Sequence, residues 1–304
     1  MARHSLRADL LMLLTALIWG TTFVAQKMGM DAIGPFLYTG LRFALGAVLL
    51  IPVLYWFSLR RRAQNAVSPV NRSAILGGIA LGVVLTIGIN LQQVGLMFTT
   101  VTNSGFITGL YVIMVPLLGL LIGQRTGAGT WLGASLAVVG MYLLSVGENF
   151  SVASGDWLQL AGAVIWGVHV LLAGRMASRH DPILIAYVQF ITCAVISSLL
   201  ALAFEPWVLE KIIQALPAIV YGGALAVAVG FTLQLVAQRD APPAHAAIIL
   251  SLEAVFAAMA GWVMMDETLT LRGFIGCGLM FAGMLVAQLL PMLFKRPSAV
   301  AESA

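Results

Sequence analysis

The sequence predicts an all-α membrane protein, a polytopic chain whose helices cross a bilayer many times. Of its 304 residues 61% are hydrophobic, and only 28 carry a charge, 16 of them basic and 12 acidic. A soluble chain of this length would carry about 76 charged residues, roughly a quarter of the total. So few charges cannot form a water-exposed surface. The composition excludes a soluble enzyme, a disordered chain and a secreted disulfide scaffold.

Ten segments are long and apolar enough for membrane helices, each of which needs roughly 20 mostly apolar residues. They lie at about residues 9–28, 35–57, 74–97, 101–123, 130–147, 156–174, 182–204, 214–237, 243–264 and 272–294. All the loops are short, the longest running from Ser58 to Arg72. No soluble domain fits between the segments, so we expect the function to reside within the bilayer.

The basic residues predict the orientation, because Lys and Arg are retained on the cytoplasmic side of a membrane. With ten spans and a cytoplasmic N-terminus, twelve basic residues fall in inner segments, and only Lys27, Lys211 and Arg272 fall in outer ones. Arg42 lies within a span. We therefore expect both termini to be cytoplasmic, in a multi-pass protein of the cell membrane, the bacterial inner membrane.

An internal repeat divides the chain into two halves. With a shift of 147 residues, 12 of the 42 residues from 9 to 50 are identical, including Trp19 with Trp166. A shift of 142 aligns Gln92 with Gln234, and a shift of 143 aligns the fifth segment with the tenth. A nearly constant offset along the chain indicates a duplicated unit of five helices.

An odd number of spans forces the second unit to enter the membrane from the opposite side. The sequence therefore predicts two inverted-topology five-helix repeats, residues 1–147 and 148–304, related by a pseudo-two-fold axis in the membrane plane. Such symmetry is typical of secondary transporters, in which exchanging the conformations of the halves turns an inward-open state into an outward-open one.

Several motifs resemble the EamA-type carriers of the drug/metabolite transporter superfamily. The resemblance covers both repeats and rests on Trp19-Gly20, Trp166-Gly167, Leu41-Arg42-Phe43, residues 103–106 through Pro116, and residues 237–247, 251–256 and 266–268. It implies a ten-helix exporter or exchanger of small metabolites that hydrolyses no ATP and has a central cavity. The chain departs from the family pattern at Ala254, where Pro is usual, and at Gln124, where Glu is common.

Charged and polar residues inside the spans are the candidate site, because a charge at the bilayer centre costs roughly 2.5–3.5 kcal/mol even on the mildest scale. Only Arg42 and Glu253 are charged and deep, at similar depths, so that they either pair or both line a wet cavity. We predict that eight residues face a central polar cavity and bind substrate: Arg42, Asn90, Gln92, Asn103, Tyr111, Gln234, His245 and Glu253. The alternatives are snorkelling for Arg42, a structural acid for Glu253, and interhelical hydrogen bonds for the amides.

Other residues carry no chemistry in this interpretation. Trp19 and Trp166 are of a kind more often used in packing, and Cys193 and Cys277 lie in apolar runs as buried thiols. The four histidines are scattered, and there is no Walker A, HExxH or GxSxG sequence and no metal-ligand spacing. We expect no catalytic residue, no metal and no cofactor, and neither an enzyme nor a nucleic-acid partner.

The leading hypothesis is a secondary active transporter that works by alternating access around the central cavity. One acid, one base and many amides favour a zwitterionic or neutral metabolite, such as an amino acid, moved across the plasma membrane. The alternatives are an exporter of drugs or toxic compounds with the same fold, a membrane-embedded enzyme, or a receptor or channel. The expected partners are the lipid bilayer and a small-molecule substrate, with a proton as a conceivable coupling ion, in a monomer or a homodimer.

Overall fold

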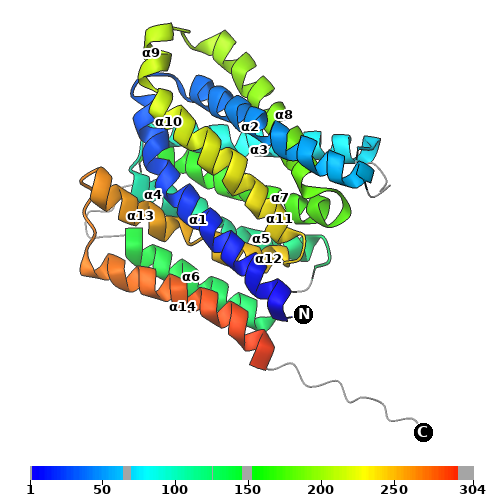
Figure 1. Cartoon of the computed structure of the whole chain (residues 1–304). Coiled ribbons are helices and arrows are strands. Elements are labelled where there is room, and N and C mark those ends of the chain that lie inside the picture. The colour runs from blue at the N-terminus through cyan, green and yellow to red at the C-terminus, as the bar shows by residue number, and fades with distance from the viewer. Residues whose placement is uncertain (1, 64–69, 125, 146–152, 294–304) are drawn as a thin grey trace.

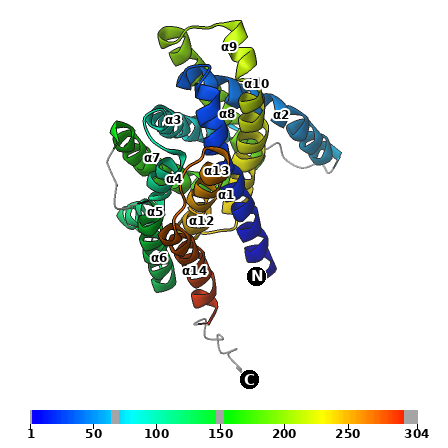
Figure 2. The same ribbon diagram turned by 90° about the vertical axis from the view of Figure 1, so that its left-hand side faces the viewer.

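The computed structural model describes residues 2–63, 70–124, 126–145 and 153–293, and every regular element in these ranges is a helix (Figures 1 and 2). Eight helical segments of the described chain are long and apolar enough to cross a membrane. Two shorter apolar helices, 128–144 and 271–287, fall on the fifth and tenth predicted spans. The all-helical prediction is confirmed, while the crossing of the membrane by all ten segments and their inverted arrangement stay predictions.

The described residues of the first half form six helices: α1 Ala2–Met30, α2 Pro35–Ala63, α3 Arg72–Leu96, α4 Val101–Gly109, α5 Tyr111–Leu121 and α6 Ala128–Ser145. Polar side chains start two of them. The Asn71 Oδ1 accepts the backbone N–H of Ala74, at 2.8 Å, and the Thr100 hydroxyl accepts that of Asn103, at 3.1 Å. Such caps satisfy backbone donors that have no partner within the helix itself.

The second half contains the remaining elements: α7 Ser154–Arg179, α8 Pro182–Phe204, α9 Leu209–Gln214, α10 Leu216–Tyr221, η1 Gly222–Phe231, α11 Thr232–Gln238, α12 Pro243–Leu250, α13 Glu253–Met264 and α14 Leu271–Leu293. Asp181 caps α8, its Oδ1 accepting the N–H groups of Ile183 and Leu184 at 2.8 and 3.0 Å. Pro182 suits the first position of α8, because its missing N–H would have had no helical partner there.

Three of the predicted spans are found as candidate membrane spans but are not continuous α-helices. The fourth is broken at Leu110, between α4 and α5, and the ninth at Ser251–Leu252, between α12 and α13. At both breaks a backbone N–H group donates to the carbonyl three residues earlier. The N–H of Leu110, for example, donates to the carbonyl of Ile107. The eighth span passes through the π-helix η1, where wider i→i+5 turns replace α-helical ones.

The helices form a bundle with one pair at each edge. Helices α6 and α14 lie together at one edge, α2 and α8 pack together toward the opposite edge, and α1, α5, α7 and the broken helices lie between them (Figure 1). The start of α1 and the end of α14 lie at the same end of the bundle (Figure 1). The central helices therefore have neighbours on several sides, and polar side chains on them can be kept away from lipid.

Glycines bring α6 and α14 into backbone contact. A Cβ added to Gly133 would lie 2.6 Å from the carbonyl oxygen of Gly283, and one added to Gly283 would lie 2.6 Å from that of Gly133. Gly140 faces Gly276 in the same manner. Without a hydrophobic effect between helices in lipid, this close approach supplies the packing that holds them together.

We expect Gly140→Val to disrupt this helix pair. Its Cβ would lie 2.5 Å from the Gly276 carbonyl oxygen and 2.9 Å from the Met280 backbone nitrogen, and neither can move without shifting α14. The cost should reach or exceed about 3 kcal/mol, the upper part of the range for overpacking. Thermal unfolding of the purified protein in detergent measures the loss. The matched control is Gly278→Val on α14, because a Cβ there meets nothing within 4 Å; equal unfolding temperatures of the two variants would contradict the expectation.

Candidate substrate site

The two helix breaks bring Tyr111 and Glu253 to equivalent positions. Tyr111 is the first residue of α5, and Glu253 is the first residue of α13. They are separated by 142 residues, the same offset that aligns Gln92 with Gln234. In membrane transporters, broken helices near the middle of the bilayer typically form the binding site, because unwound backbone is tolerated only where it lines a cavity.

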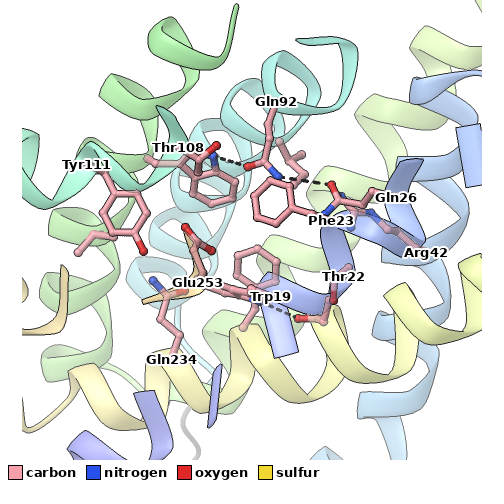
Figure 3. A pocket seen from close by; sticks show the side chains of 15 residues that line it. Trp19, Thr22, Phe23, Gln26, Arg42, Gln92, Thr108, Tyr111, Gln234 and Glu253 are labelled. Carbon is pink, nitrogen blue, oxygen red and sulfur yellow. Dashed lines mark hydrogen bonds between the residues drawn. The ribbon is translucent and has the colours of Figure 1, made fainter. Parts of the chain in front are cut away.

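A cavity lies between these breaks, enclosed by α1, α2, α3, the two broken helices, α7, η1 and α11 (Figure 3). Five of the eight predicted residues line it: Arg42, Gln92, Tyr111, Gln234 and Glu253. Its free volume is about 30 Å³, which holds about two water molecules. In this conformation the cavity is thus contracted around polar groups and too small for a metabolite.

One end of the cavity is acidic. The Glu253 carboxylate lies beside the Tyr111 hydroxyl and the Gln234 amide in Figure 3, and the Glu253 side chain is buried. The Tyr111 hydroxyl and the Glu253 carboxylate interact with each other, and among the described residues neither amide atom of Gln234 has a hydrogen-bond partner. Buried polar atoms are nearly always paired, so unpaired ones around a cavity indicate a place for water or a ligand.

The other end of the cavity is basic. Arg42 is 1% exposed, and its Nη2 donates to Gln93 Oε1 at 3.2 Å and to Gln26 Oε1 at 3.5 Å. Its guanidinium carbon lies 5.2 Å from the ring centre of Tyr38. No carboxylate among the described residues lies within 4.0 Å of it, so Arg42 and Glu253 do not pair. The guanidinium is held by neutral partners, and its Nε has none.

Aromatic rings form the wall between the two ends. Trp19 and Phe231 have ring centres 4.6 Å apart, and the rings of Trp166 and Phe231 lie nearly parallel at 6.0 Å. Trp166 Nε1 donates to Gln92 Oε1 at 2.9 Å, and Trp19 Nε1 donates to the Ala226 carbonyl at 3.2 Å. Both tryptophans therefore line the cavity, although their residue type favoured a packing role in the sequence. The sequence did contain a signal for this role, because the 147-residue repeat aligns Trp19 with Trp166 and so predicts equivalent positions for the two side chains.

Three predicted residues lie outside this cavity. Asn90 faces α8, where its Nδ2 donates to the Ser197 hydroxyl at 2.9 Å. Asn103 lies half-buried in the first turn of α4. His245 lies near the start of α12, with its Nε2 2.9 Å from Asp9 Oδ1 on α1. The contacts of Asn90 and His245 join helices, and the structure does not bring these three residues to the other five.

Sequence reasoning missed three polar residues of the lining: Thr22, Gln26 and Thr108. Gln26 accepts from Arg42 Nη2 and, at 3.4 Å, from Gln92 Nε2, so it links α1 to α2 and α3. A signal was present, because Trp19, Thr22 and Gln26 follow one another at three- and four-residue spacing. That spacing places them on one face of a helix.

Two carboxylates bind the start of a helix in the other half of the chain. Glu267 accepts the backbone N–H groups of Val101 and Thr102 at the start of α4, at 2.8 and 3.0 Å. Glu205 accepts those of Phe36 and Leu37 at the start of α2, at 2.9 and 2.7 Å. A carboxylate at a helix N-terminus satisfies unpaired donors and complements the helix dipole. We call these two groups of contacts the carboxylate clamps.

The positions equivalent to the clamps carry other residues. Shifted by 143, Glu267 falls on Gln124, and both follow a residue with positive φ, Asp266 at 55° and Gly123 at 80°. Gln124 is exposed, and within the described chain its side chain has no hydrogen bond to α12. Shifted by 147, Glu205 falls on Ser58, whose hydroxyl donates to the carbonyl of Tyr55 in its own helix. The clamps are therefore present at one end of the bundle only.

Apolar helices long enough to cross a membrane, packed around a small, buried, polar cavity, define a polytopic membrane protein. The sequence profile of the EamA-like transporter family matches residues 6–146 and again residues 153–288. The chain belongs to this family. It is a membrane transporter, and its family implies a small-molecule substrate.

Individual relatives support this assignment. The chain is 29% identical to an uncharacterized transporter of Archaeoglobus fulgidus, over 93% of this chain and 86% of that protein. It is 27% identical to the uncharacterized inner membrane transporter YedA of Escherichia coli, over 53% of this chain and 51% of YedA. A protein of known crystal structure has the same fold, with a TM-score of 0.76 over 95% of this chain and 99% of that one, at 22% identity.

Proposed function

We propose that the protein is a secondary active transporter that moves a small zwitterionic metabolite, such as an amino acid, across the bacterial inner membrane. The observation that carries this proposal is the pair of buried charges, Arg42 and Glu253, at opposite ends of one cavity without a partner of opposite charge. An uncompensated buried charge costs several kcal/mol. A zwitterion supplies both counter-charges at once, its carboxylate to Arg42 and its ammonium group to Glu253.

The remaining lining suits the middle of such a substrate. Gln92, Gln234 and Tyr111 offer both donors and acceptors, and Trp19, Trp166 and Phe231 offer flat apolar surface. The lining of neutral amides is also compatible with a neutral polar metabolite. We therefore propose a substrate-binding role for the five predicted residues that line the cavity, together with Gln26, and a structural role for Asn90 and His245.

The transport mechanism that we propose is alternating access between two inverted repeats, residues 1–147 and 148–304. The two separate matches to one family profile support a duplicated unit. The glycine contacts support a two-fold relation, because Gly133 and Gly140 are equivalent to Gly276 and Gly283 at an offset of 143. A two-fold axis between α6 and α14 would map the contact of Gly133 with Gly283 onto that of Gly276 with Gly140.

The contracted cavity also supports alternating access. With a free volume of about 30 Å³ it cannot hold an amino acid, so the halves must separate before substrate enters. In this conformation both carboxylate clamps are closed, and the opposite end lacks them. The clamps would have to open when the substrate passes through the end of the bundle that they close. Export or exchange is the direction that the family resemblance implies, and Glu253 is the group that would carry a coupling proton.

A second candidate is an exporter of aromatic cations such as drugs. The observation in its favour is the ring wall of Trp19, Trp166 and Phe231 beside a single buried acid, a combination that attracts organic cations. Such a substrate would leave Arg42 without a partner and add a positive charge to the same cavity. We prefer the zwitterion for that reason.

Flux into liposomes tests the proposal. Purified protein is reconstituted into vesicles loaded with unlabelled amino acid, and uptake of radiolabelled amino acid is compared with that of protein-free vesicles. We expect zwitterionic amino acids to exchange faster than their methyl esters, which lack the carboxylate, and faster than N-acetylated forms, which lack the ammonium group. Equal flux of the esters and the free amino acids would exclude the zwitterion and favour the exporter of cations.

The orientation that we propose has both termini in the cytoplasm, as either a monomer or a homodimer. The excess of Lys and Arg in the predicted inner segments supports this orientation, and the relative YedA is named an inner membrane transporter. Reporter fusions at Ser68 and Ser151, which lie outside the described residues, decide the question. We expect Ser68 to report a cytoplasmic position and Ser151 a periplasmic one. The reverse result would contradict both the orientation and the inverted repeat.

A further inference from the structure

A second and larger cavity opens between α5, α7 and the loop that joins α11 to α12. Its volume is about 790 Å³, and it lies at the end of the bundle that lacks the carboxylate clamps. Gln124, the residue equivalent to the clamp residue Glu267, is part of its lining. We call it the lateral groove. At the other end of the bundle Glu267 accepts the N–H of Val101 at 2.8 Å, and Lys27 donates to the Thr99 carbonyl at 2.5 Å.

The polar part of the lateral groove is positively charged. Arg175 and Arg179 come from the end of α7, Arg239 comes from the loop after α11, and all three are exposed. Within the described chain none of them has a carboxylate within 4.0 Å, although Asp240 is also in the lining. Three arginines against one aspartate give a net charge of +2 in a groove at the end of the membrane-spanning helices. Such basic pockets between helices are typical sites for anionic lipid headgroups.

The apolar part of the groove faces outward. Leu121 is 82% exposed and Ile122 is 61% exposed, both beside the half-exposed Leu118 at the end of α5. These side chains continue the apolar surface of the span 101–121. A soluble anion would gain nothing from them, whereas the acyl chains of a lipid would cover them.

A buried acceptor at the inner wall supplies an independent indication of a ligand. The Gln238 side chain is 2% exposed, and its Nε2 donates to the Val170 carbonyl at 3.0 Å. Its Oε1 has no partner among the described residues. Because this side chain lines the groove, a hydroxyl group of an occupant can donate to it.

We propose that the lateral groove binds one anionic phospholipid with a hydroxylated headgroup, of the phosphatidylglycerol type. The phosphodiester would lie among Arg175, Arg179 and Arg239, a headgroup hydroxyl would donate to Gln238, and the acyl chains would cover Leu121 and Ile122. A net charge of +2 favours this lipid over zwitterionic phosphatidylcholine of equal chain length. The site lies outside the central cavity, and the proposal does not depend on which substrate the protein carries.

Titration of the purified full-length protein with lipid, followed by native mass spectrometry, tests the proposal. We expect phosphatidylglycerol to bind more tightly than phosphatidylcholine with the same chains. The double variant Arg175→Gln/Arg179→Gln should weaken phosphatidylglycerol binding about 30-fold, at roughly a factor of five for each arginine near the headgroups. Both side chains are exposed, so the variant should fold, and a single symmetric peak in size-exclusion chromatography verifies this.

The matched control is Arg72→Gln, because Arg72 is exposed at the start of α3 and is not part of the groove. It should bind phosphatidylglycerol as the wild type does. Equal binding of the two lipids, or equal binding by the double variant and the control, would overturn the proposal. The soluble headgroup glycerophosphoglycerol serves as a third probe. If it displaces the lipid at similar concentrations, the groove is a site for soluble anions and the lipid assignment is wrong.

Discussion

Glu253→Gln should abolish amino-acid flux while the protein still inserts into the membrane and purifies. The carboxylate is the sole acidic side chain in the described lining of the central cavity, where Tyr111 is its neighbour. Glutamine preserves the shape of the side chain but removes both the negative charge and the group that could carry a proton. Counterflow of radiolabelled amino acid in liposomes measures the effect, with the unfolding temperature recorded in parallel.

Glu253→Asp and Glu210→Gln complete this test. Aspartate keeps the charge on a shorter stem, so that part of the flux should remain. Glu210 lies exposed on α9, and its change to glutamine should leave flux unaltered. Any residual flux of Glu253→Gln should no longer depend on pH if this residue carries the coupling proton. Normal flux with unchanged pH dependence would make Glu253 a structural acid, and the coupling role would fail.

Arg42→Gln should reduce the transport efficiency for a zwitterionic substrate about a hundredfold. A hydrogen bond to a charged group contributes about 1.5–3 kcal/mol, and here it would join a buried guanidinium to the substrate carboxylate. Removing Arg42 also removes the donor that meets Gln26 and Gln93. Initial rates over a range of substrate concentrations give the ratio kcat/KM in which the loss appears.

The substrate dependence of this loss separates binding from folding. An amino-acid methyl ester lacks the carboxylate, so Arg42→Gln should not lower its transport, whereas Arg42→Lys should restore part of the flux of the free amino acid. The exposed Arg72→Gln is the control for loss of a positive charge. If Arg42→Gln lowered the flux of ester and amino acid equally, the guanidinium would support the structure without contacting the substrate carboxylate.

Hydropathy located the eight candidate spans and the two shorter apolar helices, but not the short helix α9 or the breaks within spans. A span is recognised by its length and apolar content, and Leu110 or Leu252 is as apolar as its neighbours. Gly109 precedes the first break, but glycines are also frequent inside the unbroken spans, and Pro116 lies six residues beyond Leu110. The breaks depend on packing between helices, which one sequence does not reveal. Likewise, nothing in the composition of residues 222–231 distinguished the π-helix η1 from an ordinary span.

The candidate site was predictable to the extent that burial in a membrane restricts polar side chains. The cost of exposing charge to lipid predicted that Arg42 and Glu253 face inward, and the repeat predicted that Gln92 and Gln234 share one site; all four line the cavity. The same reasoning does not identify partners. Asn90 and His245 are also polar residues of predicted spans, but they bond to other polar residues away from the cavity. Asn90 donates to Ser197, and His245 lies at hydrogen-bond distance from Asp9.

The carboxylate clamps also bear on the energetics of the proposed transport cycle. Two identical halves related by symmetry would give two end states of equal free energy, and the empty carrier would populate both alike. Here Glu267 and Glu205 stabilise closure at one end, while Gln124 and Ser58 do not do so at the other. If the two halves work as the proposed inverted repeats, this difference would give the carrier a preferred resting state, from which only a substrate with higher affinity for the opposite state could shift it.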